Sequence, residues 1–248
     1  MKKNNDMNNR RIRMSEMLEK ARKYEDEQGK QIKAKDRPVF HVSPYVGWMN
    51  DPNGFSYYRG EYHLFYQYHP YDTYWNSMHW GHVVSKDLLH WEYLPAALAP
   101  DEEYDKIGCF SGSATELGDG RQLLIYTAVD QEKMEDGTVR DIQTQAVAVG
   151  DGKDYKKYEK NPVLTAKDLP EGASKVDFRD PKIWKGKDGT SIVLSEADQQ
   201  TEVDRFFFIE ARMDLSGNLS ASLQKIRNVL ERCGNVRTSL NWMENTFF

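Results

Sequence analysis

The stretch FSYYRGEYHLFYQY occupies residues 55–68. Runs rich in Tyr and Phe stand on either side of Arg59-Gly60, and aromatic residues favour strands. Arg59-Gly60 is a turn signal between the two runs, so the stretch is typical of short strands separated by a turn. Similar short apolar runs, separated by turn residues, follow at residues 79–85, 122–128 and 143–149. The chain is therefore predicted to be all-β.

Short strands in series fit two architectures. Four-stranded antiparallel units placed one after another suit a β-propeller. Periodicity alone does not separate a propeller from a sandwich, and the sequence shows no clean internal repeat. Both architectures remain open on the strand pattern alone.

The first 37 residues differ from the rest of the chain because they are highly charged. We predict an amphipathic helix over about residues 9–27 that packs on the outside of the main domain, with Ser15 as its cap. A basic helix on a membrane surface is the alternative, which the short apolar stripe disfavours. The apolar positions of the stripe follow helical spacing: Ile12, Met14, Met17, Leu18 and Ala21.

Composition narrows the class of protein. The 248 residues suit one all-β domain or two small ones, and the net charge of −5 argues against a nucleic-acid partner. Two cysteines, Cys109 and Cys233, form no disulfide framework and fit a reducing compartment. No apolar run approaches the roughly 20 residues that span a bilayer, and the N-terminus lacks a signal-peptide core. We expect a cytoplasmic protein without a membrane partner.

Two stretches place carboxylates beside turn residues. Residues 48–54 read WMNDPNG, and Asn, Asp, Pro and Gly together favour a tight turn, which most often has no further role. A Trp before the turn and aromatic strands after it make Asp51 a candidate in a sugar site. In FRDP, residues 178–181, the Pro is expected to push Asp180 into an extended conformation. A surface ion pair of Arg179 and Asp180 is the structural alternative.

Other chemistries fit the sequence less well. His79 and His82 invite a metal site, but in a strand they would project to opposite faces, and no carboxylate cluster completes a ligand set. Ser111 and Ser113 lack the Gly-x-Ser-x-Gly elbow of a serine hydrolase. No Gly-rich phosphate loop is present. We therefore expect neither a cofactor nor a metal.

Six motifs occur in one order along residues 40–184. Taken together they resemble glycoside hydrolase family 32, which comprises invertases, sucrose-6-phosphate hydrolases, inulinases and levanases. The resemblance implies a five-bladed β-propeller followed by a β-sandwich. The motifs are WMNDPNG at 48–54, FYQYHP at 65–70, HWGH with SKDLLHW within 79–91, FSGS at 110–113, YTA at 126–128 and FRDP at 178–181.

The resemblance assigns roles by motif. Asp51 matches the nucleophile that attacks the anomeric carbon of fructose, and Asp180 matches the carboxylate that stabilises the transition state, with Arg179 beside it. A retaining glycosidase needs such a nucleophile together with a separate acid/base residue. The implied partner is a small sugar: sucrose, sucrose-6-phosphate or a fructan end, and the oligomeric state stays open. Residues at sugar-contacting positions are Asn50, Gln67, Trp75, Phe110 and Ser111.

One motif of the family is missing. The family's acid/base is the Glu of a Glu-Cys motif, usually Trp-Glu-Cys-Pro, and the sequence contains none. The nearest match is Glu231-Arg232-Cys233, while Glu196, Glu202 and Glu210 lack suitable neighbours. Without this acid the chain is expected to hydrolyse sucrose poorly. A non-catalytic fructoside-binding remnant or a pseudogene product is the alternative, and fructosyl transfer or inulin hydrolysis are alternatives within the family.

The chain after residue 190 no longer follows the alternation of strands and turns. Residues 191–200 and 220–232 look loosely helical, and we expect a disordered or loosely helical tail. Residues Leu230–Leu240 can be encoded by a DNA sequence that, translated from two bases further on, gives a peptide containing Trp-Glu-Cys-Pro. We therefore hypothesise a frameshift near Gly189-Thr190, with a divergent or spliced tail as the alternative. The expected organisation is a helix and linker at 1–37, an incomplete five-bladed propeller at 38–190 and an out-of-frame tail at 191–248, with the sandwich missing.

Overall fold

The computed structural model describes residues 14–169, 174, 176–185, 191–196, 206–213 and 219–221. In these residues, twelve strands form three four-stranded antiparallel sheets, each built from strands consecutive in sequence. The prediction of a mostly β chain with an N-terminal helix is confirmed. None of the described helices is long and apolar enough to cross a bilayer.

The three sheets have the same internal order. Sheet 1 contains β1 (Trp48–Tyr58), β2 (Glu61–His69), β3 (His79–Ser85) and β4 (Glu92–Leu98). Sheet 2 contains β5 (Gly108–Glu116), β6 (Gln122–Lys133), β7 (Val139–Gly150) and β8 (Tyr155–Lys157). Sheet 3 contains β9 (Arg179–Lys185), β10 (Ser191–Glu196), β11 (Phe206–Met213) and β12 (Leu219–Ala221).

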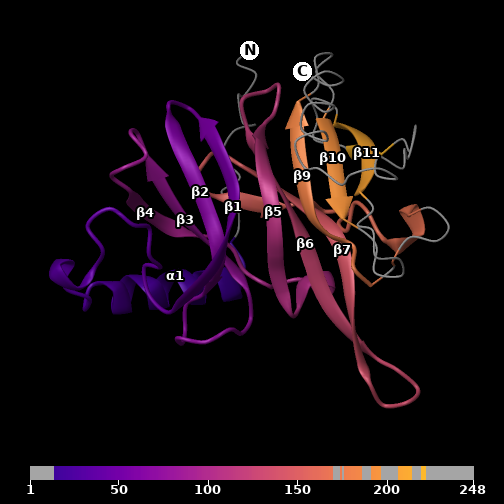
Figure 1. Ribbon diagram of the computed structural model, residues 1–248, viewed down its shortest axis with the longest axis horizontal. Helices are drawn as coiled ribbons and strands as arrows, with labels where there is room; N and C mark the ends of the chain where they lie inside the picture. The colour runs from indigo at the N-terminus through magenta and orange to yellow at the C-terminus, as the bar shows by residue number, and fades with distance from the viewer. Residues whose placement is uncertain are drawn as a thin grey trace, which may run out of the picture.

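The first strands of the sheets lie side by side. Figure 1 shows β5 between β1 and β9, and β5 contacts both of them. Each sheet therefore extends outward from a shared inner row of strands. Three short 3₁₀ turns lie in the connections, at Ala34–Asp36, Glu103–Asp105 and Ala166–Asp168.

The turn expected at Arg59-Gly60 is present, and it joins two paired antiparallel strands. Strand β1 ends at Tyr58 and β2 begins at Glu61, which leaves Arg59-Gly60 as a two-residue turn. Both turn residues have positive φ, 49° at Arg59 and 87° at Gly60. A type I′ turn requires positive φ at both central positions, and its twist matches that of the flanking strands.

Apolar side chains fill the spaces between neighbouring sheets. Between sheets 1 and 2 the core holds Phe65, Trp80, Leu124 and Tyr126, all fully buried or nearly so. Burying each such large side chain contributes roughly 1.5–3 kcal/mol. Between sheets 2 and 3 the core holds Leu123, Ile125, Val147, Leu164, Phe178 and Ile183.

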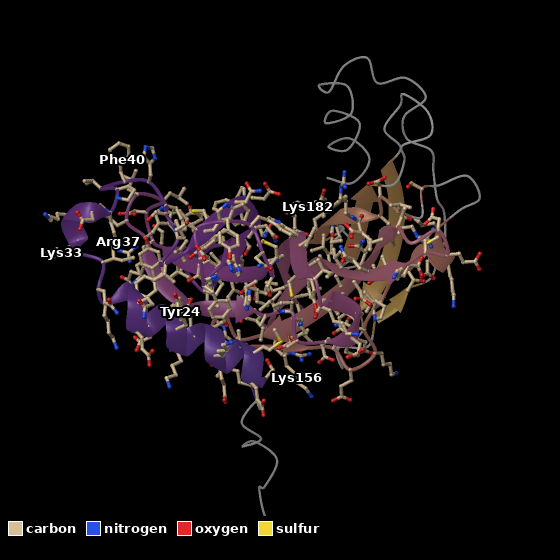
Figure 2. All side chains as sticks on the ribbon, turned by 90° about the horizontal axis from the view of Figure 1, so that it is seen from below. Tyr24, Lys33, Arg37, Phe40, Lys156 and Lys182 are labelled. Carbon is tan, nitrogen blue, oxygen red and sulfur yellow. The ribbon has the colours of Figure 1, made fainter. Side chains whose placement is uncertain are left out.

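The predicted N-terminal helix is present but begins later than expected. Helix α1 spans Glu16–Gly29, and the Ser15 hydroxyl caps it by accepting the Leu18 N–H at 3.2 Å. Residues 14 and 15 are described and are not helical, so the prediction of a helix from about residue 9 is wrong at these two positions. Leu18 packs against Tyr66, Tyr68 and other residues of sheet 1, which confirms a helix on the outside of the domain. Figure 2 shows α1 along one side of the molecule, with Tyr24 on it.

The helical interpretation of residues 191–200 is wrong where the structure describes them. Ser191–Glu196 is strand β10, which pairs with both β9 and β11. Pairing with two strands overrides a weak helical pattern, since Ile192 and Val193 are β-branched and suit a strand. Leu219–Ala221 is also a strand, while residues 222–248, including Cys233, lie outside the described residues. The reading-frame hypothesis concerns the coding DNA and stays a prediction.

One buried carboxylate on α1 gives the fold a pH dependence. Glu25 is only 5% exposed, and its Oε1 accepts the Ala96 N–H of β4 at 2.8 Å. Burial raises the pKa of Glu25 to about 7, because the charged form loses hydration. The folded protein therefore binds more protons than the unfolded chain between about pH 4.5 and 7. Stability from this group is lost as the pH rises through that window.

Replacing Glu25 with Gln is therefore expected to stabilise the protein at pH 8 and to change little at pH 4. The amide keeps an acceptor for Ala96 but carries no charge, so the variant should gain up to about 3 kcal/mol at pH 8. Urea unfolding at both pH values measures the difference. Glu19→Gln, an exposed position on the same helix, is the control. An equal effect of Glu25→Gln at both pH values would contradict the ionisation argument.

Candidate active site

A β-bulge interrupts the first strand of each sheet at an equivalent place. In β1, Asn50 and Asp51 both stand opposite Gln67, since Met49 pairs with Tyr68 and Pro52 with Tyr66. The same register shift occurs in sheets 2 and 3. Bulges bend a strand and re-aim its side chains, and they are common beside active sites. We call them bulge 1 (Asn50-Asp51), bulge 2 (Phe110-Ser111) and bulge 3 (Asp180-Pro181).

Bulges 1 and 2 are joined by a hydrogen bond at the position of the predicted nucleophile. The Ser111 hydroxyl donates to Asp51 Oδ2 at 3.1 Å. The Asp51 side chain is exposed, so it can be reached by a ligand. A hydroxyl that donates to a carboxylate holds that carboxylate in one orientation. This arrangement suits a nucleophile.

Bulge 3 does not have the backbone predicted for it. Asp180 has φ +56°, in the left-handed region, rather than the extended conformation expected before Pro181. Asp tolerates this region better than most residues do, but the conformation still costs about 1–2 kcal/mol. The Asp180 N–H donates to the Thr127 hydroxyl at 2.8 Å, so a neighbouring sheet holds the backbone in place. The tertiary contact overrides the local preference.

The Asp180 carboxylate lies in a mixed electrostatic environment. Burial raises its pKa, the Arg179 guanidinium lowers it, and the negative charge of Asp51 raises it. Arg179 Nε lies 3.6 Å from Asp180 Oδ2, and Arg179 Nη1 lies 3.1 Å from Asp177 Oδ1. Asp51 and Asp180, the two predicted catalytic carboxylates, line the same cavity.

An open cavity of about 380 Å³ collects residues from all three bulges. Its volume falls in the range of small-molecule pockets. Lys182, which lines it, is labelled in Figure 2 on the side of the molecule away from α1. The lining residues are Asp51, Pro52, Asn53, Gly54, Phe55, Ser111, Gly112, Ser113, Asp180, Pro181 and Lys182.

The remaining predicted sugar contacts are not among the residues that line this cavity. Asn50, Phe110 and Arg179 are chain neighbours of lining residues. Trp75 is 52% exposed and meets Phe110 edge to face, with ring centroids 6.2 Å apart. Gln67 is buried, and its Nε2 donates to the Cys109 carbonyl at 3.0 Å. The structure thus brings Asp51, Ser111 and Asp180 to one cavity, while the other five predicted residues are absent from its lining.

Three residues of the site were not singled out as functional by sequence reasoning. Asn53 lines the cavity while its amide nitrogen and oxygen are buried without a hydrogen-bond partner among the described residues. Ser113 accepts the Ile183 N–H at 2.8 Å and donates to the Pro181 carbonyl at 2.7 Å. Thr127 joins bulges 2 and 3. All three lie within the motifs quoted above, so proximity to a motif was the available signal.

His79 and His82 project to opposite faces of β3, as predicted. The His82 ring stacks on Phe65 at 4.1 Å, and its Nε2 lies 3.0 Å from His63 Nδ1. His79 Nδ1 instead lies 2.7 Å from the Ser77 carbonyl. Within the described residues, no three His, Cys, Asp or Glu side chains gather as metal ligands would.

Comparisons with known proteins identify the family of the chain. Residues 41–211 match the model of the glycosyl hydrolases family 32 N-terminal domain. A sucrose-6-phosphate hydrolase of Zymomonas mobilis is 43% identical over 179 residues, which cover 71% of this chain and 34% of that protein. The chain therefore spans about a third of the length of this relative.

Two solved structures share the fold. A GH32 β-fructofuranosidase of Bombyx mori, solved as a mutant in complex with sucrose, is 39% identical with a TM-score of 0.67, covering 86% of this chain and 43% of that one. Fructan 1-exohydrolase IIa of Cichorium intybus, in complex with 1-kestose, is 32% identical with a TM-score of 0.60, covering 78% and 35%. The antiparallel sheets described above thus match part of the fold of these proteins.

Proposed function

Because the chain belongs to glycosyl hydrolase family 32, we propose that its cavity binds the terminal fructosyl unit of a β-D-fructofuranoside and carries the nucleophile of a retaining hydrolase. The observation that supports this most directly is the Ser111–Asp51 hydrogen bond at a cavity that Asp180 also lines. The three sheets are then three blades of a five-bladed propeller, with the site at their inner strands.

In the proposed mechanism Asp51 forms a covalent bond to the anomeric carbon of fructose while the bond to the leaving oxygen breaks. The leaving oxygen takes a proton from an acid, and water then hydrolyses the fructosyl-Asp51 ester to restore the carboxylate. Ser111 orients Asp51 for the attack. Positive charge develops on the sugar ring in the transition state, and the negative charge of Asp180 stabilises it.

The acid is the part that the sequence does not provide, since no Glu-Cys motif is present. This favours a second candidate function, a fructoside-binding protein that turns its ligand over slowly or not at all. Both functions require the same fructose-binding cavity. They differ in whether sucrose is cleaved.

The substrate class follows from the relatives. The family members compared above include a structure with sucrose and one with 1-kestose, so we propose sucrose, sucrose-6-phosphate or a fructan end as the ligand. We also propose a cytoplasmic location, because Cys109 is a buried free thiol, which fits a reducing compartment.

Isothermal titration calorimetry of the purified chain with fructose tests the proposal. We expect saturable heat with fructose and none with glucose. Asp180→Asn should weaken fructose binding about tenfold or more, because it removes a charged hydrogen-bond acceptor. Asp136→Asn, at the exposed turn between β6 and β7, should bind like the wild type. Equal heats with glucose and fructose, or no saturable heat with fructose, would overturn the proposed function.

A further inference from the structure

We propose that Thr127 is a positioning residue that sets the Asp180 carboxylate in the site, and that it does so from the neighbouring sheet. The proposal rests on the proposed function, in which Asp180 contacts the fructosyl unit. Thr127 lies on β6, opposite bulge 2, and its side chain is fully buried. It lies outside the set of residues that line the cavity, so its role is to hold other residues.

The Thr127 hydroxyl makes two hydrogen bonds of opposite sense. It donates to the Ser111 carbonyl at 3.1 Å and accepts the Asp180 N–H at 2.8 Å. A hydroxyl has one donor and two acceptor positions, so these contacts use its only proton. One side chain thereby ties bulge 2, which presents Ser111 to Asp51, to bulge 3, which presents Asp180.

Asp180 needs this support more than an ordinary strand residue would. Its φ of +56° is unfavourable for a non-glycine residue, and such conformations persist only where surrounding structure imposes them. The Thr127 contact fixes the N–H of Asp180 itself. Immediately after it, Ser113 holds both the Pro181 carbonyl and the Ile183 N–H. Side chains of sheet 2 therefore hold the backbone at Asp180 and just after it.

The residues before Asp180 are held in the same way. Gln145 Nε2 donates to the Phe178 carbonyl at 2.7 Å, and Gln143 Oε1 accepts the Phe178 N–H at 3.1 Å. Sheet 2 thus positions the start of β9 through polar side chains. Among the side chains that do so, Thr127 is the one that reaches the Asp180 backbone.

Sheet 1 holds sheet 2 by an equivalent contact. Gln67 stands opposite bulge 1 and donates to the Cys109 carbonyl, directly before bulge 2. Thr127 stands opposite bulge 2 and bonds to bulge 3. In both cases the residue opposite one bulge fixes the first strand of the next sheet. The recurrence supports positioning, rather than incidental packing, as the role of Thr127.

Amide hydrogen exchange followed by NMR tests the contact directly. Thr127→Val keeps the shape but removes the hydroxyl, so exchange of the Asp180 amide should become about tenfold faster or more. Thr127→Ser keeps the hydroxyl and should restore protection to within about threefold of the wild type. Thr144→Val is the matched control, because Thr144 is a buried Thr on β7 whose hydroxyl bonds to the Ala128 carbonyl instead.

Fructose affinity tests the consequence. Thr127→Val should weaken fructose binding about tenfold, while Thr127→Ser and Thr144→Val should bind within about threefold of the wild type. Unchanged Asp180 exchange, or unchanged affinity, in Thr127→Val would overturn the inference. So would an equal loss in Thr144→Val, because that result would indicate general destabilisation. If the wild-type chain binds no fructose, the proposed function fails separately, and the exchange data still decide whether Thr127 positions Asp180.

Discussion

Replacing Asp51 with Asn is expected to abolish hydrolysis of β-D-fructofuranosyl fluoride by this chain. Fluoride is a weak base and leaves without strong help from an acid, so this substrate tests the nucleophile without the missing proton donor. The amide of Asn is a poor nucleophile and cannot form the fructosyl ester. Removing the nucleophile from a hydrolase costs on the order of 10³–10⁶-fold in rate, and fluoride release measured with an ion-selective electrode reports it.

Two variants make this experiment specific. Ser111→Ala should reduce the rate much less, by about tenfold, because it removes the hydrogen bond that orients Asp51 but leaves the carboxylate. Asp136→Asn should not change it. Full activity in Asp51→Asn would remove Asp51 from the nucleophile role, whatever the chain binds.

Restoring the alternative reading frame after codon 190 is expected to raise sucrose hydrolysis by about 10²–10⁴-fold, the usual contribution of a general acid. The glycosidic oxygen of sucrose, unlike fluoride, is a strongly basic leaving group and needs a proton. The frame-restored protein would carry Trp-Glu-Cys-Pro where Cys233–Arg237 now stand, with its Glu at the position of Gly234 and Asn235. Glucose release from sucrose, compared between the two proteins, measures the gain.

Two controls separate the acid from better folding. A frame-restored protein with Gln in place of the Glu of that motif should lose the gain on sucrose while it keeps hydrolysis of the fluoride. Sequencing the DNA across codons 185–195 and 230–240 tests the premise. Codons that give no Trp-Glu-Cys-Pro in the offset frame would end the hypothesis, as would normal sucrose turnover by the 248-residue chain.

Local sequence predicted the elements whose structure depends on local chemistry. The turn at Arg59-Gly60 followed from a turn signal between two aromatic runs. Ser15 was a predictable helix cap, because a hydroxyl before a helix satisfies a free backbone N–H. A mostly β chain also followed from the alternation of apolar runs and turns, although this pattern alone left both a propeller and a sandwich open.

Features that depend on contacts between sheets were beyond local reasoning. Pro181 correctly indicates a preference for extended backbone at Asp180, yet Asp180 has a positive φ. The Thr127 hydroxyl, more than fifty positions earlier in the chain, accepts the Asp180 N–H and stabilises this conformation. The bulges were equally hidden, since a register shift appears only when two strands are paired. The same cause made the helical interpretation of Ser191–Glu196 wrong, because pairing with β9 and β11 decided its structure.

The motifs predicted which residues belong to the candidate site, but they did not predict how these residues are arranged. The motif match indicated Asp51, Asp180 and Ser111, and the structure brings these three to one cavity. It did not indicate Thr127, Ser113 or Asn53, although each stands within a quoted motif. The side chains of Thr127 and Ser113 bond to backbone groups, and the Asn53 amide has no hydrogen-bond partner among the described residues. The residue type alone therefore gives little sign of a role in the site.

Because side chains of one sheet hold the first strand of the next, the candidate site can form only late in folding. Each four-stranded sheet is made of consecutive hairpins, whose local contacts form quickly. The cavity, in contrast, takes residues from three different sheets, and Gln67 and Thr127 can act only after their neighbours have docked. Fructose binding should therefore develop later in refolding than β-sheet circular dichroism does. A ligand that binds only the docked form would in turn slow the separation of the sheets.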